Sequence, residues 1–162
     1  MQQSNGSIEK QTKILIELLE EFDLEDILEF GVFYQKKQKE AYSDLMWEAC
    51  AFITCVGGEQ NFLNFLAWLI AQGQDVYTKA LENPDSLHEI LDSENRGDAR
   101  DEFFSSVVMK AHHAKVGNNN VRFPRHLVPV VTKKRAKELS SGQSVRQALP
   151  NLHEKLGQCP EI

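Results

Sequence analysis

The chain has 162 residues, of which 41% are hydrophobic and 26% charged, so its composition is that of one ordinary globular domain. No apolar run approaches the ~20 residues that a membrane-spanning helix needs. The first ten residues lack the basic and apolar segments of a secretory signal. We therefore expect a cytoplasmic protein that makes no contact with a membrane.

The net charge of −6 is distributed unevenly along the chain. Residues 1–105 carry a net charge of −13, whereas residues 106–162 carry +7. Two interpretations remain open: the basic part lies across the acidic helices, or it contacts an anion outside the chain. The acidic part predicts a surface that repels nucleic acid and attracts basic proteins.

Helical periodicity runs through the first third of the chain. It predicts one helix from near Ser7 and a second helix that Asp23 caps. The residues expected on the apolar faces are Ile8, Leu15, Leu18, Leu19 and Phe22 in the first helix and Leu24, Ile27, Leu28, Phe33 and Tyr34 in the second. The next segment, residues 45–56, is apolar all round, so we expect it to be central and to end at Gly57 and Gly58.

Residues 67–87, with the sequence AWLIAQGQDVYTKALENPDSL, give the clearest local signals. Gly73 interrupts an apolar helical pattern, which then resumes. After it the sequence predicts a new helix, with Asn83 as the N-cap, Pro84 at the first helical position and Asp85 in the positively polarised first turn.

The last third of the chain changes character. The apolar spacing of residues 103–111 predicts a helix that Gly117 ends. Pro124 and Pro129 then force extended backbone on the residues before them, and residues 133–139 predict a short basic helix.

A last helical piece follows a cap at Ser144. Taken together, the pattern predicts an all-α fold, a single domain of about six or seven packed helices. Residues 1–120 form the helical domain, and residues 121–162 form an irregular basic C-terminal arm with a short terminal helix.

Cysteine usage gives little sign of a metal or disulfide framework. Cys50, Cys55 and Cys159 are odd in number and show no Cys-x-x-Cys spacing. We expect reduced thiols, as is usual in a cytosolic protein. We predict no cofactor and no metal site.

A family resemblance rests on a defined set of residues. They are the segment Trp47-Glu48-Ala49-Cys50-Ala51-Phe52-Ile53, the Gly57-Gly58 turn, Phe62, Phe65 and residues 67–87. Together they resemble an uncharacterised bacterial family called domain of unknown function 4240, over roughly residues 24–115. The resemblance implies a helical domain and no assigned activity.

The chain departs from that family at the turn before Phe62. The Cys-Ser-Asp-Asp-Gly typical of the family corresponds here to residues 57–61, so that Glu59 is the remaining carboxylate of the pair. The resemblance therefore implies no paired-carboxylate mechanism for this chain.

Two tryptophans, Trp47 and Trp68, and three carboxylates, Asp44, Glu48 and Glu59, are candidates for binding. The two tryptophans can line a pocket between helices, but a Trp on an apolar helix face is more often a core anchor. The three carboxylates can gather near the glycine turn and split their pKa values. Acidic residues at helix starts more often interact with the helix dipole.

One further set can hold a divalent metal. Asp85, His88 and Asp92 share a helical face, although surface positions on an amphipathic helix are the more ordinary interpretation. His112 and His113 are adjacent and point about 100° apart, so we expect one to face the core and the other solvent.

The basic arm supplies candidate anion contacts: Arg122, Arg125, Lys133, Lys134 and Arg135. Such cations can grip phosphates, and a neighbouring aromatic ring suits single-stranded nucleic acid. No helix-turn-helix or RNA-binding signature accompanies them, so nucleic acid is not the expected partner.

Motifs of catalysis are absent from the sequence. There is no Gly-x-Ser-x-Gly elbow, no phosphate loop and no Gly-x-Gly-x-x-Gly, and we assign no catalytic residue. The expected function is a non-catalytic cytosolic protein-interaction module that binds a basic protein partner, for instance an immunity- or antitoxin-like inhibitor. The alternative is a small-molecule-binding or hydrolytic domain with a pocket between the Trp47 and Trp68 helices. The oligomeric state is left open.

Overall fold

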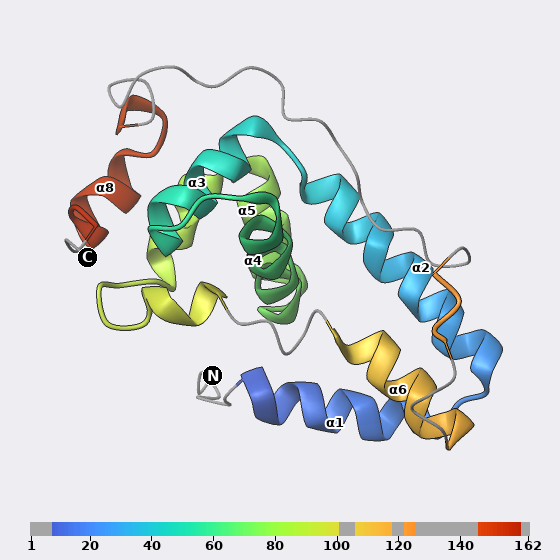
Figure 1. The fold of residues 1–162 in the computed structure, drawn as a ribbon. Helices are drawn as coiled ribbons and strands as arrows, with labels where there is room; N and C mark the ends of the chain where they lie inside the picture. The colour runs from blue at the N-terminus through green and yellow to red at the C-terminus, as the bar shows by residue number, and fades with distance from the viewer. Residues whose placement is uncertain (1–7, 101–105, 118–121, 126–145, 160–162) are drawn as a thin grey trace.

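A computed structural model describes residues 8–100, 106–117, 122–125 and 146–159, and every regular element in these ranges is helical. The elements, in chain order, are α1 (Ile8–Glu20), α2 (Leu24–Ala41), α3 (Asp44–Thr54), α4 (Glu59–Ala71), α5 (Gln74–Glu82), the 3₁₀ helices η1 (Pro84–Glu89) and η2 (Arg96–Arg100), α6 (Val107–Val116) and α8 (Pro150–Leu156) (Figure 1). The predicted all-α class is confirmed. The predicted domain boundary at residue 120, the helix over 133–139 and the cap at Ser144 lie outside the described residues.

Side chains and glycines predicted from sequence set several helix ends. Asp23 caps α2, because its carboxylate accepts a hydrogen bond from the Asp26 backbone N–H at 3.0 Å. Asn83 caps η1 in the same way through the Asp85 N–H, with Pro84 at the start as predicted. Gly117 ends α6 with a φ of 70°, a left-handed conformation that glycine adopts without steric cost.

Helix α4 lies between two clusters of buried side chains. On one side Phe62, Phe65 and Leu69 join a cluster formed with α3, α5, η1, η2 and α8. On the other side Ala67 joins a cluster formed with α1, α2 and α6. The central helix is therefore α4. Helix α3, over the segment predicted to be central, has no exposed residue and buries Met46, Ala49 and Ile53 in the first cluster, but it is α4 that lies between the two clusters.

A buried carboxylate accepts hydrogen bonds from the N-terminus of α8. Asp85, which is 2% exposed, accepts hydrogen bonds from the backbone N–H groups of Asn151 and Leu152 and from the Asn151 side chain, at 2.7–3.1 Å. It thereby satisfies donors that the first turn of a helix leaves unpaired. The expectation that Asp85 lies on a helix surface was wrong, because a segment 66 residues away covers it.

A buried arginine and a disulfide hold the other end of α8. The Arg96 guanidinium donates to the carbonyls of Ile53 at 2.8 Å and Leu156 at 3.2 Å. Cys55 and Cys159 are joined by a disulfide, so the expectation of reduced thiols was wrong for this pair, and Cys50 is the free thiol. A native disulfide typically stabilises a fold by about 2–4 kcal/mol.

We expect Asp85→Ala to lower the free energy of unfolding by about 2–4 kcal/mol, because two backbone N–H groups and one amide lose a charged acceptor. Urea denaturation followed by circular dichroism measures the change. The control, Glu94→Ala, removes an exposed carboxylate and is expected to cost less than about 0.5 kcal/mol. Equal losses in the two variants would contradict a capping role.

Candidate functional site

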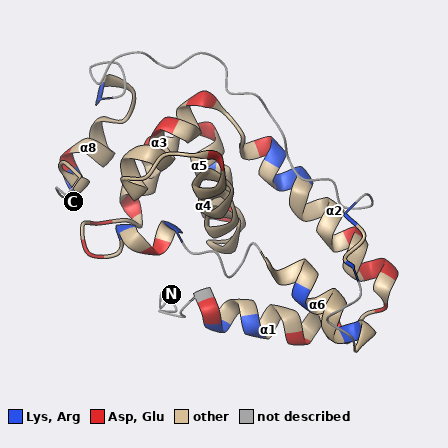
Figure 2. Cartoon of the chain, viewed as in Figure 1, with Lys and Arg blue, Asp and Glu red and all other residues tan. Residues whose placement is uncertain are grey.

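The turn between α1 and α2 gathers negative charge. Residues 17–29 contain seven acidic residues and no lysine or arginine, and all seven are exposed. Figure 2 shows acidic residues at this corner of the molecule. Glu17 pairs with Lys13 at 3.9 Å, whereas no ion pair within the described residues involves Glu20, Glu21, Glu25, Asp26 or Glu29. The Lys115 ammonium also donates to the Glu20 carbonyl at 2.9 Å, so two described lysines, Lys13 and Lys115, lie against the seven carboxylates and the corner keeps a net negative charge.

Exposed apolar side chains lie among these carboxylates. Ile14 is 47% exposed, Leu18 50% and Phe22 52%. The expectation that Leu18 and Phe22 belong to a buried face was wrong. The apolar residues that α1 buries against its neighbours are Leu15, Ile16 and Leu19. Helix α1 carries apolar residues on two sides. Its neighbouring helices cover the side with Leu15 and Leu19, so the side with Ile14 and Leu18 remains in water.

The second helix shows the same discrepancy. Leu24 is 40% exposed and Phe33 55% exposed, although both were expected on the apolar face. Ile27 and Tyr34 are buried as predicted, because α2 packs against α4 and α6 through that side. The Phe33 ring instead contacts the Lys37 ammonium, 5.6 Å from the ring centroid.

The apolar and acidic side chains of α1 share one face. Positions three, four and seven residues apart lie on the same side of a helix. Ile14, Glu17 and Leu18 share one side of α1, Glu21 and Phe22 follow in the turn after α1 ends, and Glu25 lies in the first turn of α2; we call these six residues the corner face. Its chemistry is that of a docking surface, since the apolar stripe gains free energy on leaving water and the carboxylates select positive charge.

The two tryptophans lie in the cluster around α3 and α4. Trp68 is 3% exposed and Trp47 is half-buried. Trp47 contacts Phe62 with ring centroids 4.6 Å apart, Phe62 contacts Phe65 at 6.4 Å, and Phe65 contacts Trp68 at 5.6 Å. Two fully buried phenylalanines therefore occupy the space between the indoles.

The three candidate carboxylates occupy opposite ends of α3. Asp44 begins α3 and Glu48 lies one turn further on, whereas Glu59 begins α4 after α3 has ended. Since a helix rises about 1.5 Å per residue, α3 places its first and last residues roughly 15 Å apart. The structure thus brings Asp44 and Glu48 near one another and leaves Glu59 at the other end.

The remaining candidates are dispersed. Arg122 and Arg125 are exposed, on a segment that packs against the cluster of α1, α2 and α6 through Phe123 (Figure 1). Lys133, Lys134 and Arg135 lie outside the described residues. Asp92 accepts hydrogen bonds from the N–H groups of the loop that follows it. Among the described residues no three His, Cys, Asp or Glu side chains gather as metal ligands.

An open hollow of about 590 Å³ runs along α1 beside the corner face. Its lining mixes positive and negative side chains: Lys10, Lys13 and Lys110 with Glu9, Glu17 and Glu20. Thr12 also lines it, and in the part of the chain that the structure describes its buried hydroxyl has no hydrogen-bond partner. The hollow presents no single charge, so it offers less selectivity than the corner face.

His112 is the buried member of the histidine pair. It is 6% exposed, its ring packs edge-on against Phe123 at 5.2 Å, and its Nδ1 has no hydrogen-bond partner among the described residues. Burial, with the neighbouring His113, lowers the pKa of His112 below its usual value. Burial also lowers the pKa of His153. His113 is half-buried, where solvent exposure was expected.

Comparisons with known proteins identify a family and add no function. A family described as "Protein of unknown function (DUF4240)" matches residues 1–114, which confirms the resemblance seen in the sequence and extends it to include α1. No curated protein and no solved structure matches the chain. None of the described helices is long and apolar enough to cross a membrane. The corner face could not be found by motif, since its only signal is the run of acids around Leu18 and Phe22.

We expect stability to fall as the pH drops from about 7.5 to 5.5, because the unfolded chain binds protons at histidine before the folded chain does. The part of the folding stability that depends on neutral histidines is fully present above the unfolded pKa of about 6.5, and it is lost as the pH falls below that value. Urea midpoints measured across this range should show a shallower slope for His112→Gln. His113→Gln should keep most of the slope, because it removes the smaller cause of the lowered His112 pKa and leaves burial in place; a slope flattened more by His113→Gln than by His112→Gln would contradict the assignment.

Proposed function

Because the chain belongs to the DUF4240 family of proteins of unknown function, which brings no activity with it, we propose a function from its own surface. The protein is a non-catalytic interaction module that binds a basic protein partner through the corner face. The observation that carries this proposal is the combination of exposed Leu18 and Phe22 with Glu21 and Glu25, which form no ion pair within the described residues.

Each component of the corner face has a separate physical role. Removing apolar surface from water contributes about 25 cal/mol per Å² and supplies affinity. The carboxylates add long-range attraction, which accelerates encounter with a positive partner and excludes a negative one. A partner that satisfies both is a basic amphipathic helix, with apolar residues on one side and lysines or arginines beside them.

One version of this proposal is an immunity- or antitoxin-like inhibitor that acts in the cytoplasm on a basic toxin or nuclease. An acidic face of this kind is suited to covering a cationic substrate-binding surface, because the two potentials are complementary. In this version the corner face competes with the natural polyanionic ligand of its partner. The proposal gives the protein no catalytic residue and no cofactor.

The proposal is tested with a fluorescent helical peptide that carries leucines on one face and lysines on the other. We expect the peptide to bind, and we expect Leu18→Ser to weaken binding about tenfold, the loss that corresponds to leaving half a leucine in water. Leu81→Ser alters an exposed leucine on α5 and should leave the affinity unchanged. Fluorescence anisotropy measures both.

The charged component is tested by reversing two carboxylates. The pair Glu21→Lys and Glu25→Lys should weaken binding and flatten its dependence on salt. The pair Glu82→Lys and Glu94→Lys makes the same change in net charge at exposed positions elsewhere and should have little effect. Equal weakening by the two pairs, or no binding of the peptide by the unaltered protein, would overturn the proposal.

A further inference from the structure

Different interactions hold the two ends of α8 against the rest of the protein. At the N-terminal end the contact is the buried Asp85 carboxylate, which accepts from the Leu152 N–H at 2.8 Å and from the Asn151 N–H at 3.1 Å. Leu149 and Leu152 are fully buried beside it. None of these interactions depends on oxidation state.

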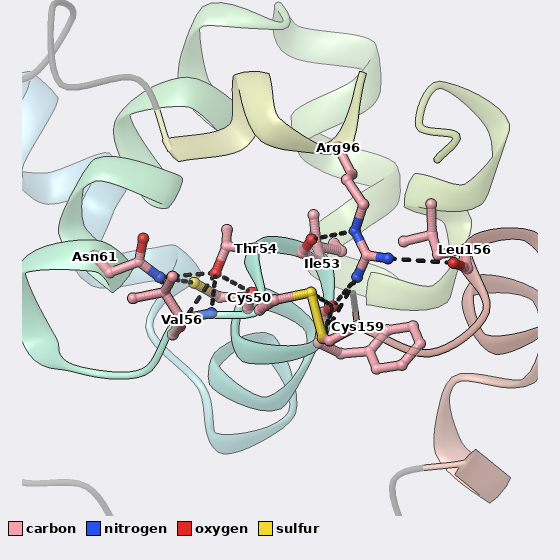
Figure 3. The surroundings of a disulfide bond; sticks show 10 residues. Cys50, Ile53, Thr54, Val56, Asn61, Arg96, Leu156 and Cys159 are labelled. Carbon is pink, nitrogen blue, oxygen red and sulfur yellow. Dashed lines mark hydrogen bonds between the residues drawn. A yellow bond between two sulfur atoms is a disulfide. The ribbon is translucent and has the colours of Figure 1, made fainter. Parts of the chain in front are cut away.

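At the C-terminal end the buried Leu156 side chain and a hydrogen bond from the Lys155 ammonium to the His88 carbonyl are joined by contacts to Arg96 and by a disulfide (Figure 3). The Arg96 guanidinium joins the Leu156 carbonyl, at 3.2 Å, to the carbonyls that end α3, those of Phe52 at 2.5 Å and Ile53 at 2.8 Å. The disulfide from Cys55 to Cys159 ties the chain beyond α8 to the same point. This bond keeps the Leu156 carbonyl at a high effective concentration near the guanidinium.

The disulfide lies where a reductant can reach it. Cys159 is exposed and Cys55 is half-buried. The Arg96 Nη2 lies 3.8 Å from the Cys159 Sγ, so the guanidinium stabilises negative charge on that sulfur when the bond breaks. A stabilised leaving thiolate speeds thiol–disulfide exchange and makes the disulfide easier to reduce.

The third cysteine does not compete in this exchange. Cys50 is 2% exposed, and burial raises the pKa of its thiol to about 12. Exchange requires a thiolate, and at neutral pH this sulfur remains protonated. The pair from Cys55 to Cys159 therefore opens and closes without reshuffling.

We propose that the C-terminal half of α8 is a redox-controlled latch, released from the end of α3 when a dithiol reductant opens the disulfide between Cys55 and Cys159. One reductant thiolate forms a bond to the Cys55 sulfur, and the electron pair of the broken bond stays on the Cys159 sulfur. The second reductant thiol displaces Cys55 and closes the reductant into a disulfide. Two electrons and two protons pass to the protein, which gains two thiols.

Release uncovers a defined surface. In the closed form the His153 ring lies over Phe52 with centroids 4.0 Å apart, and the Arg96 guanidinium lies 5.8 Å from the same ring. Opening removes the His153 ring and exposes an aromatic and cationic patch at the end of α3. The Asp85 end keeps α8 attached, so the movement is a fraying of the last turn and not a loss of the helix.

Hydrogen exchange followed by mass spectrometry tests the latch on the full chain, oxidised with diamide or reduced with dithiothreitol. We expect reduction to speed amide exchange about tenfold or more in residues 154–157 and to leave the Leu152 amide protected. Cys159→Ser should show the reduced pattern without dithiothreitol. Cys50→Ala leaves the disulfide intact and should keep the response to dithiothreitol.

A second variant tests which end of α8 opens. In oxidised protein, Asp85→Asn should speed exchange at Asn151 and Leu152 and leave residues 154–157 protected, which is the reverse pattern. Three outcomes would overturn the proposal: no disulfide in the oxidised protein by intact mass, the same exchange in both redox states, or equal acceleration along all of α8 on reduction.

Discussion

Helix α4 has to be covered on both sides, and the arrangement of the other helices follows from this constraint. Its run from Phe62 to Leu69 is buried almost throughout, so one neighbouring layer does not suffice. The cluster of α3, α5, η1, η2 and α8 covers one side, and the cluster of α1, α2 and α6 covers the other. Burial of this apolar surface supplies most of the free energy that holds the two groups together.

The corner face is a consequence of where α1 stands in that arrangement. Helix α1 belongs to the outer layer and has one layer of helices beneath it, yet its sequence carries apolar residues on two sides. Ile14, Leu18 and Phe22 therefore remain in water, at a cost that a purely structural helix would avoid by placing polar residues there. The surrounding carboxylates keep such a surface soluble and restrict which partners can cover it.

Local signals were predictable from the sequence, and contacts between distant segments were not. Asp23, Asn83 and Gly117 act within a few residues of their own position, so their side chain or backbone preference identified them. The partner of Asp85 lies 66 residues away and that of Cys55 lies 104 residues away. Periodicity also showed that α1 is amphipathic, but it did not show which of its two apolar sides is covered. The sequence therefore revealed the acidic charge of this region and did not reveal that Leu18 and Phe22 are exposed.

The corner face and the latch lie on opposite sides of α4, and this separation decides how they can influence one another. The corner residues adjoin the cluster of α1, α2 and α6, whereas α8 packs in the other cluster. A change at one site reaches the other only if it shifts α4 between two packed arrangements, and a closely packed helix resists such shifts. The Asp85 end of α8 is held by hydrogen bonds to a carboxylate, which opening of the disulfide does not alter. Under the two proposals, redox state therefore controls the patch at the end of α3 and leaves the corner face unchanged.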